Sequence, residues 1–270
     1  MREKERIILR ILFVGDVVGH GGRRAVSKLI PGLLDEYNCD FCIVNGENMA
    51  GGNGMTHNCI QEISNCGIDV FTSGDHVWDQ RGFSTEIINM PNVLRPANLP
   101  EEQPGRGFGI FTSRKNNYKV GVLNLLGRVF VGMSSNCPFA AAERIVAEMR
   151  KECKVIIVDM HAEATSEKIA MGRFLDGKVS AVLGTHTHVP TADQQIFPGK
   201  TAFISDVGMV GSRESILGRH IEPVLSKFRF GMPKRFTVND ADIRLHGVVI
   251  SVDEKTGKAS GIERVMRDIS

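Results

Sequence analysis

Two of the eight histidines of this chain lie one residue apart, in the segment VLGTHTHVPTAD at residues 182–193. An apolar run ends at His186 and His188, with a glycine before the pair and a proline after it. Imidazole is the commonest metal-binding side chain, so the spacing indicates a metal site. An exposed loop that contains two histidines by chance explains the pair alone equally well, so other candidate ligands are needed to decide.

Further side chains of this kind occur where other apolar segments end. They are Asp16 in VGD, Glu47 and Asn48 in NGEN, Asp75 and His76 in SGDH, and His161 in VDMHAEA. In α/β sheets, ligands bind just beyond the carboxyl ends of the strands. These strand ends therefore predict one cluster, to which the paired histidines contribute two ligands. The alternative is that the acidic groups only cap helices, as Asp often does.

The predicted ligand set combines carboxylates with imidazoles and contains no thiolate. It consists of Asp16, Glu47, Asp75, His161, His186 and His188. A structural zinc site of the cysteine type is therefore not expected. The set is larger than one tetrahedral ion needs and could hold two ions that share a bridging carboxylate. Two-metal sites, with ions about 3.5–4 Å apart, typically serve phosphoryl chemistry, in which a bridging water becomes a hydroxide nucleophile.

The elements that would position these residues alternate between strands and helices. Apolar strands are expected at residues 7–16, 41–48 and 68–79, with helices at 23–37 and 57–67 between them. Pro31 is expected to kink or split the first helix. Beyond residue 100 we expect strands at 105–113, 118–127, 153–163, 179–188 and 200–211, helices at 138–152 and near 166–174, and a hairpin at 245–266. This order predicts an α/β fold with two sheets in a single domain, residues 1–270.

The composition is that of an ordinary globular protein, with 42% hydrophobic and 24% charged residues and a net charge of +2. Such a charge gives no global attraction to nucleic acid or to an anionic membrane. No apolar run approaches the roughly 18 residues that a membrane span needs. The first apolar run continues into Asp16 and Gly19 and not into a small-residue cleavage site, which favours a strand over a signal peptide. The six cysteines include only one C-x-x-C pair, so we expect buried free thiols in a reducing cytoplasm.

Six motifs occur in order over nearly the whole chain: GDVVG, NGEN, GDHVWD, HAEATSEK, GTHTHVPTAD and DVGMVG. Together they resemble the YmdB-like family of bacterial metallophosphoesterases, which is related to the calcineurin-like phosphoesterases. The resemblance implies a four-layer α/β/β/α sandwich with two metal ions per chain, most often iron, with manganese, zinc or magnesium as alternatives. It also implies phosphodiesterase activity on cyclic nucleotides and assembly into homo-oligomers.

The resemblance assigns a role to each candidate residue. Asp16 and His188 would hold one ion, His161, His186 and residue 75 would hold the other, and Glu47 would bridge them. Asn48 would lie beside the ions, and His76 would act as the general acid or position the substrate.

Asp75 departs from the family pattern, in which the third motif reads Gly-Asn-His and the asparagine is a neutral ligand. The corresponding residues here are Gly74, Asp75 and His76. An additional carboxylate would bind a cation more tightly, make it less electrophilic and repel a phosphate. The departure therefore affects metal identity and catalytic rate more than it affects the fold.

These observations predict a cytoplasmic dinuclear metallophosphoesterase that hydrolyses phosphodiesters such as cyclic nucleotides. The residues by themselves support only metal-assisted hydrolysis, and the diester specificity follows from the resemblance. A metal-dependent amidohydrolase also uses His-x-His, but there the pair usually belongs to the first barrel strand, whereas here it lies in the last third of the chain. A third possibility is a metal-loaded regulator or scaffold in which Asp75 has weakened catalysis.

Overall fold

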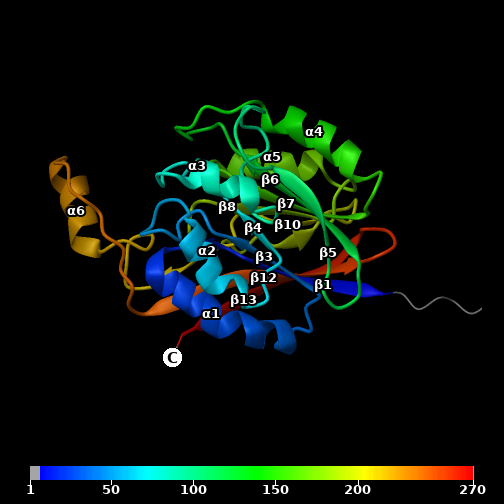
Figure 1. Ribbon diagram of the computed structural model, residues 1–270, viewed down its shortest axis with the longest axis horizontal. Helices are drawn as coiled ribbons and strands as arrows, with labels where there is room; N and C mark the ends of the chain where they lie inside the picture. The colour runs from blue at the N-terminus through cyan, green and yellow to red at the C-terminus, as the bar shows by residue number, and fades with distance from the viewer. Residues whose placement is uncertain (1–6, 270) are drawn as a thin grey trace, which may run out of the picture.

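Two β-sheets pack face to face between two layers of helices in the computed structural model, which describes residues 7–269 (Figure 1). Helices α1 and α2 cover the outer face of one sheet, and helices α4 and α5 cover the outer face of the other (Figure 1). The predicted four-layer α/β/β/α sandwich is therefore confirmed. No barrel of the amidohydrolase kind is present among the described residues, so that reading of the His-x-His pair was wrong.

The first sheet has the strand order β2-β11-β12-β1-β3-β4, with β13 paired to β12. Its strands are β1 Ile8–Val14, β2 Asp16–Val17, β3 Phe41–Asn45, β4 Val70–Thr72, β11 Met209–Ser212, β12 Ile243–Asp253 and β13 Ala259–Asp268. Strand β3 runs parallel to both β1 and β4, so the carboxyl ends of these three strands lie at one edge. Strands β12 and β13 form the predicted carboxyl-terminal hairpin.

The second sheet has the strand order β5-β6-β7-β8-β10-β9. Its strands are β5 Phe108–Thr112, β6 Lys119–Leu126, β7 Val155–His161, β8 Ala181–Thr185, β9 Gln195–Ile196 and β10 Ala202–Ile204. Strands β6, β7, β8 and β10 are parallel, which again places their carboxyl ends at a common edge.

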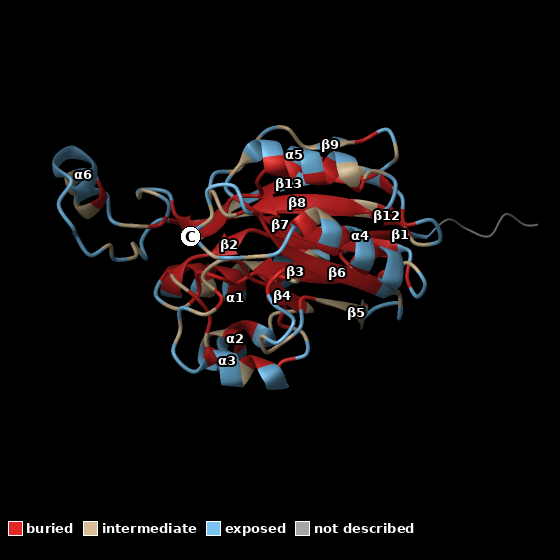
Figure 2. Ribbon diagram, turned by 90° about the horizontal axis from the view of Figure 1, so that it is seen from above, coloured by how far each residue is buried: buried red, intermediate tan, exposed pale blue. Residues whose placement is uncertain are grey.

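The helices are those expected, with two additions. They are α1 Gly19–Glu36, α2 His57–Ser64, α3 Phe83–Glu86, α4 Pro138–Met149, α5 Thr165–Phe174 and α6 Ile221–Phe230, with a 3-10 turn η1 at Ile87–Asn89. Helices α3 and α6 were not predicted. Helix α6 projects from the sandwich and is mostly exposed (Figure 2). No helix among residues 7–269 is long and apolar enough to span a membrane.

The core has three apolar layers, and β1 shows how one strand serves two of them. Leu9, Ile11 and Phe13 point to the second sheet, whereas Leu12 and Val14 point to the layer beneath α1. All five side chains are fully buried. Successive side chains of a strand point to opposite faces, so a strand buried on both faces needs a continuous apolar run.

Helix α1 begins earlier than predicted, and of the two effects expected of Pro31, a kink or a split, the split does not occur. It begins at Gly19 and continues through Pro31 without being split. Its Val26, Ile30 and Leu33 are buried against the first sheet. Burying each such side chain contributes about 1.5–3 kcal/mol. The combined contribution of the three outweighs the roughly 3 kcal/mol cost of an internal proline.

Two predicted strands are shorter or divided in the structure. The strand expected at 68–79 is limited to β4, because Ser73 turns away and donates its amide hydrogen to Asn124 Oδ1, which lies on the second sheet. The strand expected at 200–211 is divided into β10 in the second sheet and β11 in the first. The chain crosses between the sheets around Gly208, whose φ of 93° is in the left-handed region.

Candidate metal centre

The predicted ligands come together at the edge where strands of both sheets end. Asp16 and Glu47 follow β1 and β3, Asp75 follows β4, His161 ends β7, and His186 and His188 follow β8. They form two groups, one of Glu47, Asp75, His161 and His186 and the other of Asp16, Glu47 and His188. Within each group, one ligand atom per residue lies within 4.8 Å of the others. Glu47 belongs to both groups, so a carboxylate is available to two cations at once.

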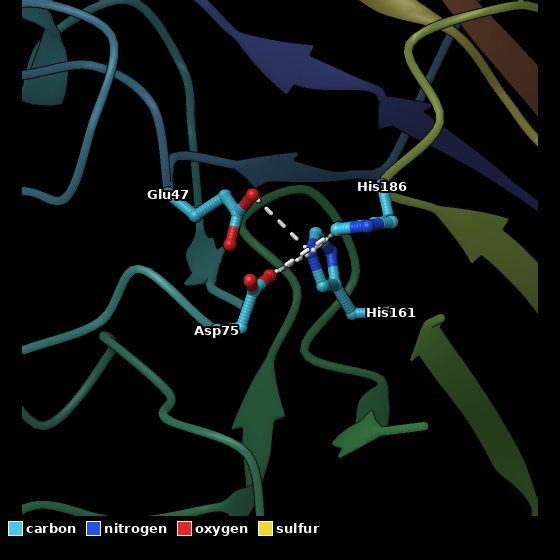
Figure 3. A group of neighbouring side chains, drawn as sticks. All are labelled: Glu47, Asp75, His161 and His186. Atoms are coloured by element: carbon cyan, nitrogen blue, oxygen red, sulfur yellow. Dashed lines mark hydrogen bonds and ion pairs between the residues drawn. The ribbon is translucent and has the colours of Figure 1, made fainter. Parts of the chain in front are cut away.

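The first group converges on the ring of His161 (Figure 3). Its Nε2 lies 3.0 Å from His186 Nδ1, 3.2 Å from Glu47 Oε1 and 3.2 Å from Asp75 Oδ1. An imidazole nitrogen carries at most one proton and cannot donate to three neighbours. A cation among these four atoms would attract all of them, so the donor set fits a metal ion.

The electrostatics of this group favour positive charge. Burial disfavours the charged form of His161, but Glu47 and Asp75 outweigh it and raise the pKa of the ring well above its ordinary value. Burial acts to raise the pKa of Asp75, yet its hydrogen bonds with His161 and His186 hold that pKa well below the usual range. A metal ion supplies the same positive charge in place of a proton.

The second group contains a buried carboxylate oxygen that accepts no hydrogen bond among the described residues and has only the ring of His161, 3.8 Å away, as an ion-pair partner. Asp16 is fully buried, and its Oδ1 has no hydrogen-bond partner among the described residues. Its Oδ2 accepts the His186 amide hydrogen at 3.2 Å. Burial raises the pKa of Asp16 well above its ordinary value, although His161 acts in the opposite direction. A buried carboxylate oxygen without a hydrogen bond is costly, and a cation would satisfy it.

His188 in the second group faces Asn48, the residue expected beside the ions. His188 Nε2 lies 3.1 Å from Asn48 Oδ1, and Asn48 Nδ2 donates to the carbonyl of Gly52. Burial lowers the pKa of His188, which favours the neutral ring that binds metal ions. Asn48 therefore contacts a candidate ligand directly.

The backbone at the histidine pair is strained. His186 and His188 have φ values of 99° and 66°, in the left-handed region that favours glycine. A non-glycine residue in such a conformation costs about 1–3 kcal/mol and persists only where its surroundings enforce it. Nothing in the local sequence pattern signals this conformation, and the strain is typical of functional sites.

Gly74 in the Gly-Asp-His motif has a steric role. A Cβ atom at this position would lie 2.1 Å from Glu47 Oε2 and 2.2 Å from His161 Nε2. Only glycine therefore allows β4 to end directly against the candidate ligands.

A buried network fixes the orientation of His161. Asp159 accepts hydrogen bonds from Asn45 Nδ2 at 2.9 Å, Thr72 Oγ1 at 2.5 Å and Thr185 Oγ1 at 2.7 Å. Because the Thr185 hydroxyl donates to Asp159, it accepts from His161 Nδ1, which lies 2.8 Å away. With a metal ion in place of the second proton, this arrangement keeps the proton on Nδ1 and directs the Nε2 lone pair at the ion.

His76, the predicted acid, lies outside both ligand groups. Its side chain is about one-third exposed, and its Nδ1 lies 2.8 Å from Asp79 Oδ2. A carboxylate at Nδ1 orients the ring and leaves Nε2 free to face a substrate.

Three further residues at the site were missed from the sequence. Asp79 contacts His76, Asp159 orients His161 through Thr185, and Glu163 Oε2 lies 3.1 Å from His186 Nε2. Asp79 ends the motif GDHVWD, Glu163 lies in HAEATSEK, and Asp159 lies in the segment VDMHAEA. An acidic residue inside the apolar run of β7 was the available signal for Asp159.

Comparison with known proteins agrees with this geometry. The profile of the YmdB-like protein family matches residues 12–265. A 2',3'-cyclic-nucleotide 2'-phosphodiesterase of Bacillus subtilis is 45% identical over 258 residues, covering 96% of this chain and 97% of the relative. A crystal structure of a novel phosphatase from Mycoplasma pneumoniae matches with a TM-score of 0.91 and 33% identity, covering 98% of this chain and 95% of that one. A hypothetical protein from Thermus thermophilus matches with a TM-score of 0.89 and 35% identity, covering 96% of this chain and 99% of that one. This chain therefore belongs to the YmdB-like protein family.

Proposed function

We propose that this chain is a metal-dependent phosphodiesterase that binds two metal ions and hydrolyses 2',3'-cyclic nucleotides or related small phosphodiesters. The observation that carries the proposal is the meeting of two ligand groups at one sheet edge with Glu47 in common. The substrate class is supported by the activity named for the Bacillus subtilis relative. The geometry by itself supports metal-assisted hydrolysis.

In this proposal the two groups divide the ligands between the ions. Asp16 and His188 serve one ion, Asp75, His161 and His186 serve the other, and Glu47 serves both. Iron is the first candidate metal, and manganese, zinc or magnesium are alternatives, since imidazole and carboxylate ligands suit several of these ions. When bound, two such ions take up negative charge on phosphate oxygens and make a water molecule more acidic.

The remaining residues act on the substrate and on the ligands. His76, held through Nδ1 by Asp79, donates a proton from Nε2 to the leaving alkoxide. Asn48, through its contact with His188, fixes that ring beside the ions.

The proposal is tested by turnover of 2',3'-cyclic AMP before and after metal removal. The chelated protein should be inactive, and activity should return with added Fe²⁺ or Mn²⁺ at about two equivalents per chain. Metal binding without turnover of any phosphodiester would favour the regulator or scaffold instead.

Asp75→Asn is expected to weaken metal binding modestly and to raise turnover at saturating metal. Asp75 Oδ1 lies 3.2 Å from His161 Nε2 and 3.3 Å from His186 Nδ1, so its charge acts within the site. Without this charge the site is more positive, so the water is more acidic and the phosphate is repelled less. One pKa unit corresponds to about a tenfold change in the ratio of the two protonation states at a given pH. We therefore expect turnover to rise by up to about tenfold. The rising limb of the pH–rate profile should move to lower pH. Lower turnover at full metal occupancy would show that the carboxylate is an adapted ligand.

We also propose that the chain forms homo-oligomers through α6. Ile221, Leu225 and Phe228 follow helical spacing and are 41, 47 and 81% exposed, whereas Val224 is the buried residue of this helix. A ten-residue helix is only marginally stable alone in water. The same apolar stripe on a second copy would cover it in a self-complementary contact. Phe228→Glu should therefore reduce the sedimenting mass, whereas Lys227→Glu on the same helix should not.

We further propose a cytoplasmic location. All six cysteines are free thiols. Cys39, Cys42 and Cys153 are buried as expected, whereas Cys59 and Cys66 are only partly buried and Cys137 is exposed. Free thiols persist in a reducing compartment.

A further inference from the structure

Two of the family motifs, HAEATSEK and DVGMVG, contribute a buried ion pair behind the candidate ligands. Lys168 Nζ, from α5, lies 2.7 Å from Asp206 Oδ2, and the two side chains are 1 and 2% exposed. The pair lies beside Gly184 in β8, where a Cβ would lie 1.8 Å from the Ser205 carbonyl oxygen and 2.9 Å from Lys168 Cδ. Neither residue belongs to a ligand group.

Asp206 connects the pair to both ligand groups through backbone amides. Its Oδ2 accepts the Thr187 amide hydrogen at 3.0 Å, and its Oδ1 accepts that of Gly208 at 2.9 Å. Thr187 separates His186 from His188, and the Gly208 carbonyl accepts the amide hydrogen of Asp16 at 3.1 Å. One carboxylate thus supports the backbone of ligands in both groups.

The strained turn at the histidines explains why such support is needed. Both histidines have left-handed φ values, and surrounding contacts must enforce that conformation. Asp206 holds the turn at its middle residue, Thr187. Lys168 provides the counter-charge that the buried Asp206 needs, in a region that already contains the buried carboxylate of Asp16.

We propose that Lys168 and Asp206 are positioning residues of the metal centre: Asp206 holds the ligand backbone of both ions, and Lys168 holds Asp206. The inference rests on the proposed metal-dependent function. It has a distinctive consequence, because loss of the pair should weaken both ion sites together. Replacing His188, by contrast, removes a ligand from one group alone.

The test is a calorimetric titration of the metal-free chain with Mn²⁺, using the wild type, Lys168→Met and Asp206→Asn. Loss of a residue that orients metal ligands typically costs about 10- to 100-fold in metal affinity. We expect a loss in this range at both sites in each variant, with circular dichroism showing a retained fold.

The chain offers a matched control at a distance from the ligands. Asp69 precedes β4, accepts the Cys42 amide hydrogen at 2.8 Å and pairs with Arg114 at 2.8 Å. Arg114→Met therefore removes the cation from another carboxylate that holds backbone. It should lower the denaturation midpoint and leave Mn²⁺ affinity unchanged.

Two outcomes would overturn the inference. The first is that Lys168→Met and Asp206→Asn lose no more Mn²⁺ affinity than the control Arg114→Met does. The other is rapid hydrogen exchange at the Thr187 and Gly208 amides of the metal-free wild type. This measurement uses only the wild type, so it does not depend on whether a variant folds. If the wild type itself binds no Mn²⁺, the proposed function fails, and the exchange rates still decide whether Asp206 holds these amides.

Discussion

Replacing His186 or His188 by alanine is expected to lower the bound metal by about one ion per chain and to lower phosphodiesterase activity by more than 100-fold. Loss of a residue that only orients ligands typically costs about 10- to 100-fold, and a ligand should cost more. The two variants should differ, because His186 belongs to the group with Asp75 and His188 to the group with Asp16. Elemental analysis and turnover of 2',3'-cyclic AMP measure the two effects.

The fold should survive these changes, because both histidines follow β8 and neither belongs to an apolar core cluster. Their positive φ values allow a sharper control. Glycine at either position removes the ligand and also relieves the backbone strain. His188→Gly should therefore lose metal as His188→Ala does, but it should unfold at a higher denaturant concentration than His188→Ala. As a control, His57→Ala changes an exposed histidine on α2 and should keep its metal. Full metal occupancy and full activity in both His186→Ala and His188→Ala would contradict the proposed site.

The sandwich and the ligand edge were predictable because each depends on a local pattern. Apolar strands alternate with helices, and an acidic residue or histidine follows where several of those strands end. Parallel strands bring such ends to one edge of a sheet, so Asp16 could be placed near Glu47, and His161 near the histidine pair, before their distances were known. The apolar run of β1 likewise predicted burial on both faces.

The supporting residues were not predictable, because their roles depend on which sheet faces which. Asp159 on the second sheet accepts from Asn45 and Thr72 on the first, and nothing in either segment indicates this contact. Lys168 and Asp206 are 38 residues apart and meet only after α5 packs near the end of β10. The division of residues 200–211 between two sheets also follows from packing and not from hydrophobic pattern.

His76→Ala should keep both metal ions and lose about 10²- to 10⁴-fold in turnover of 2',3'-cyclic AMP, the usual contribution of a general acid. The side chain lies outside both ligand groups, so metal content should not change. The substrate's leaving group is an alkoxide, which needs a proton as it departs. A nitrophenolate leaving group needs none, so the loss should be much smaller with bis(p-nitrophenyl) phosphate.

Asp79 provides the matched variant for this mechanism. It lies 2.8 Å from His76 Nδ1 and would act only through that ring. Asp79→Asn should therefore show the same dependence on leaving group as His76→Ala, with a smaller loss, because the imidazole remains present but is less firmly oriented. Equal losses on 2',3'-cyclic AMP and bis(p-nitrophenyl) phosphate in His76→Ala would contradict proton donation. Since a positioning residue acts on both substrates alike, that result would assign His76 to holding the phosphate.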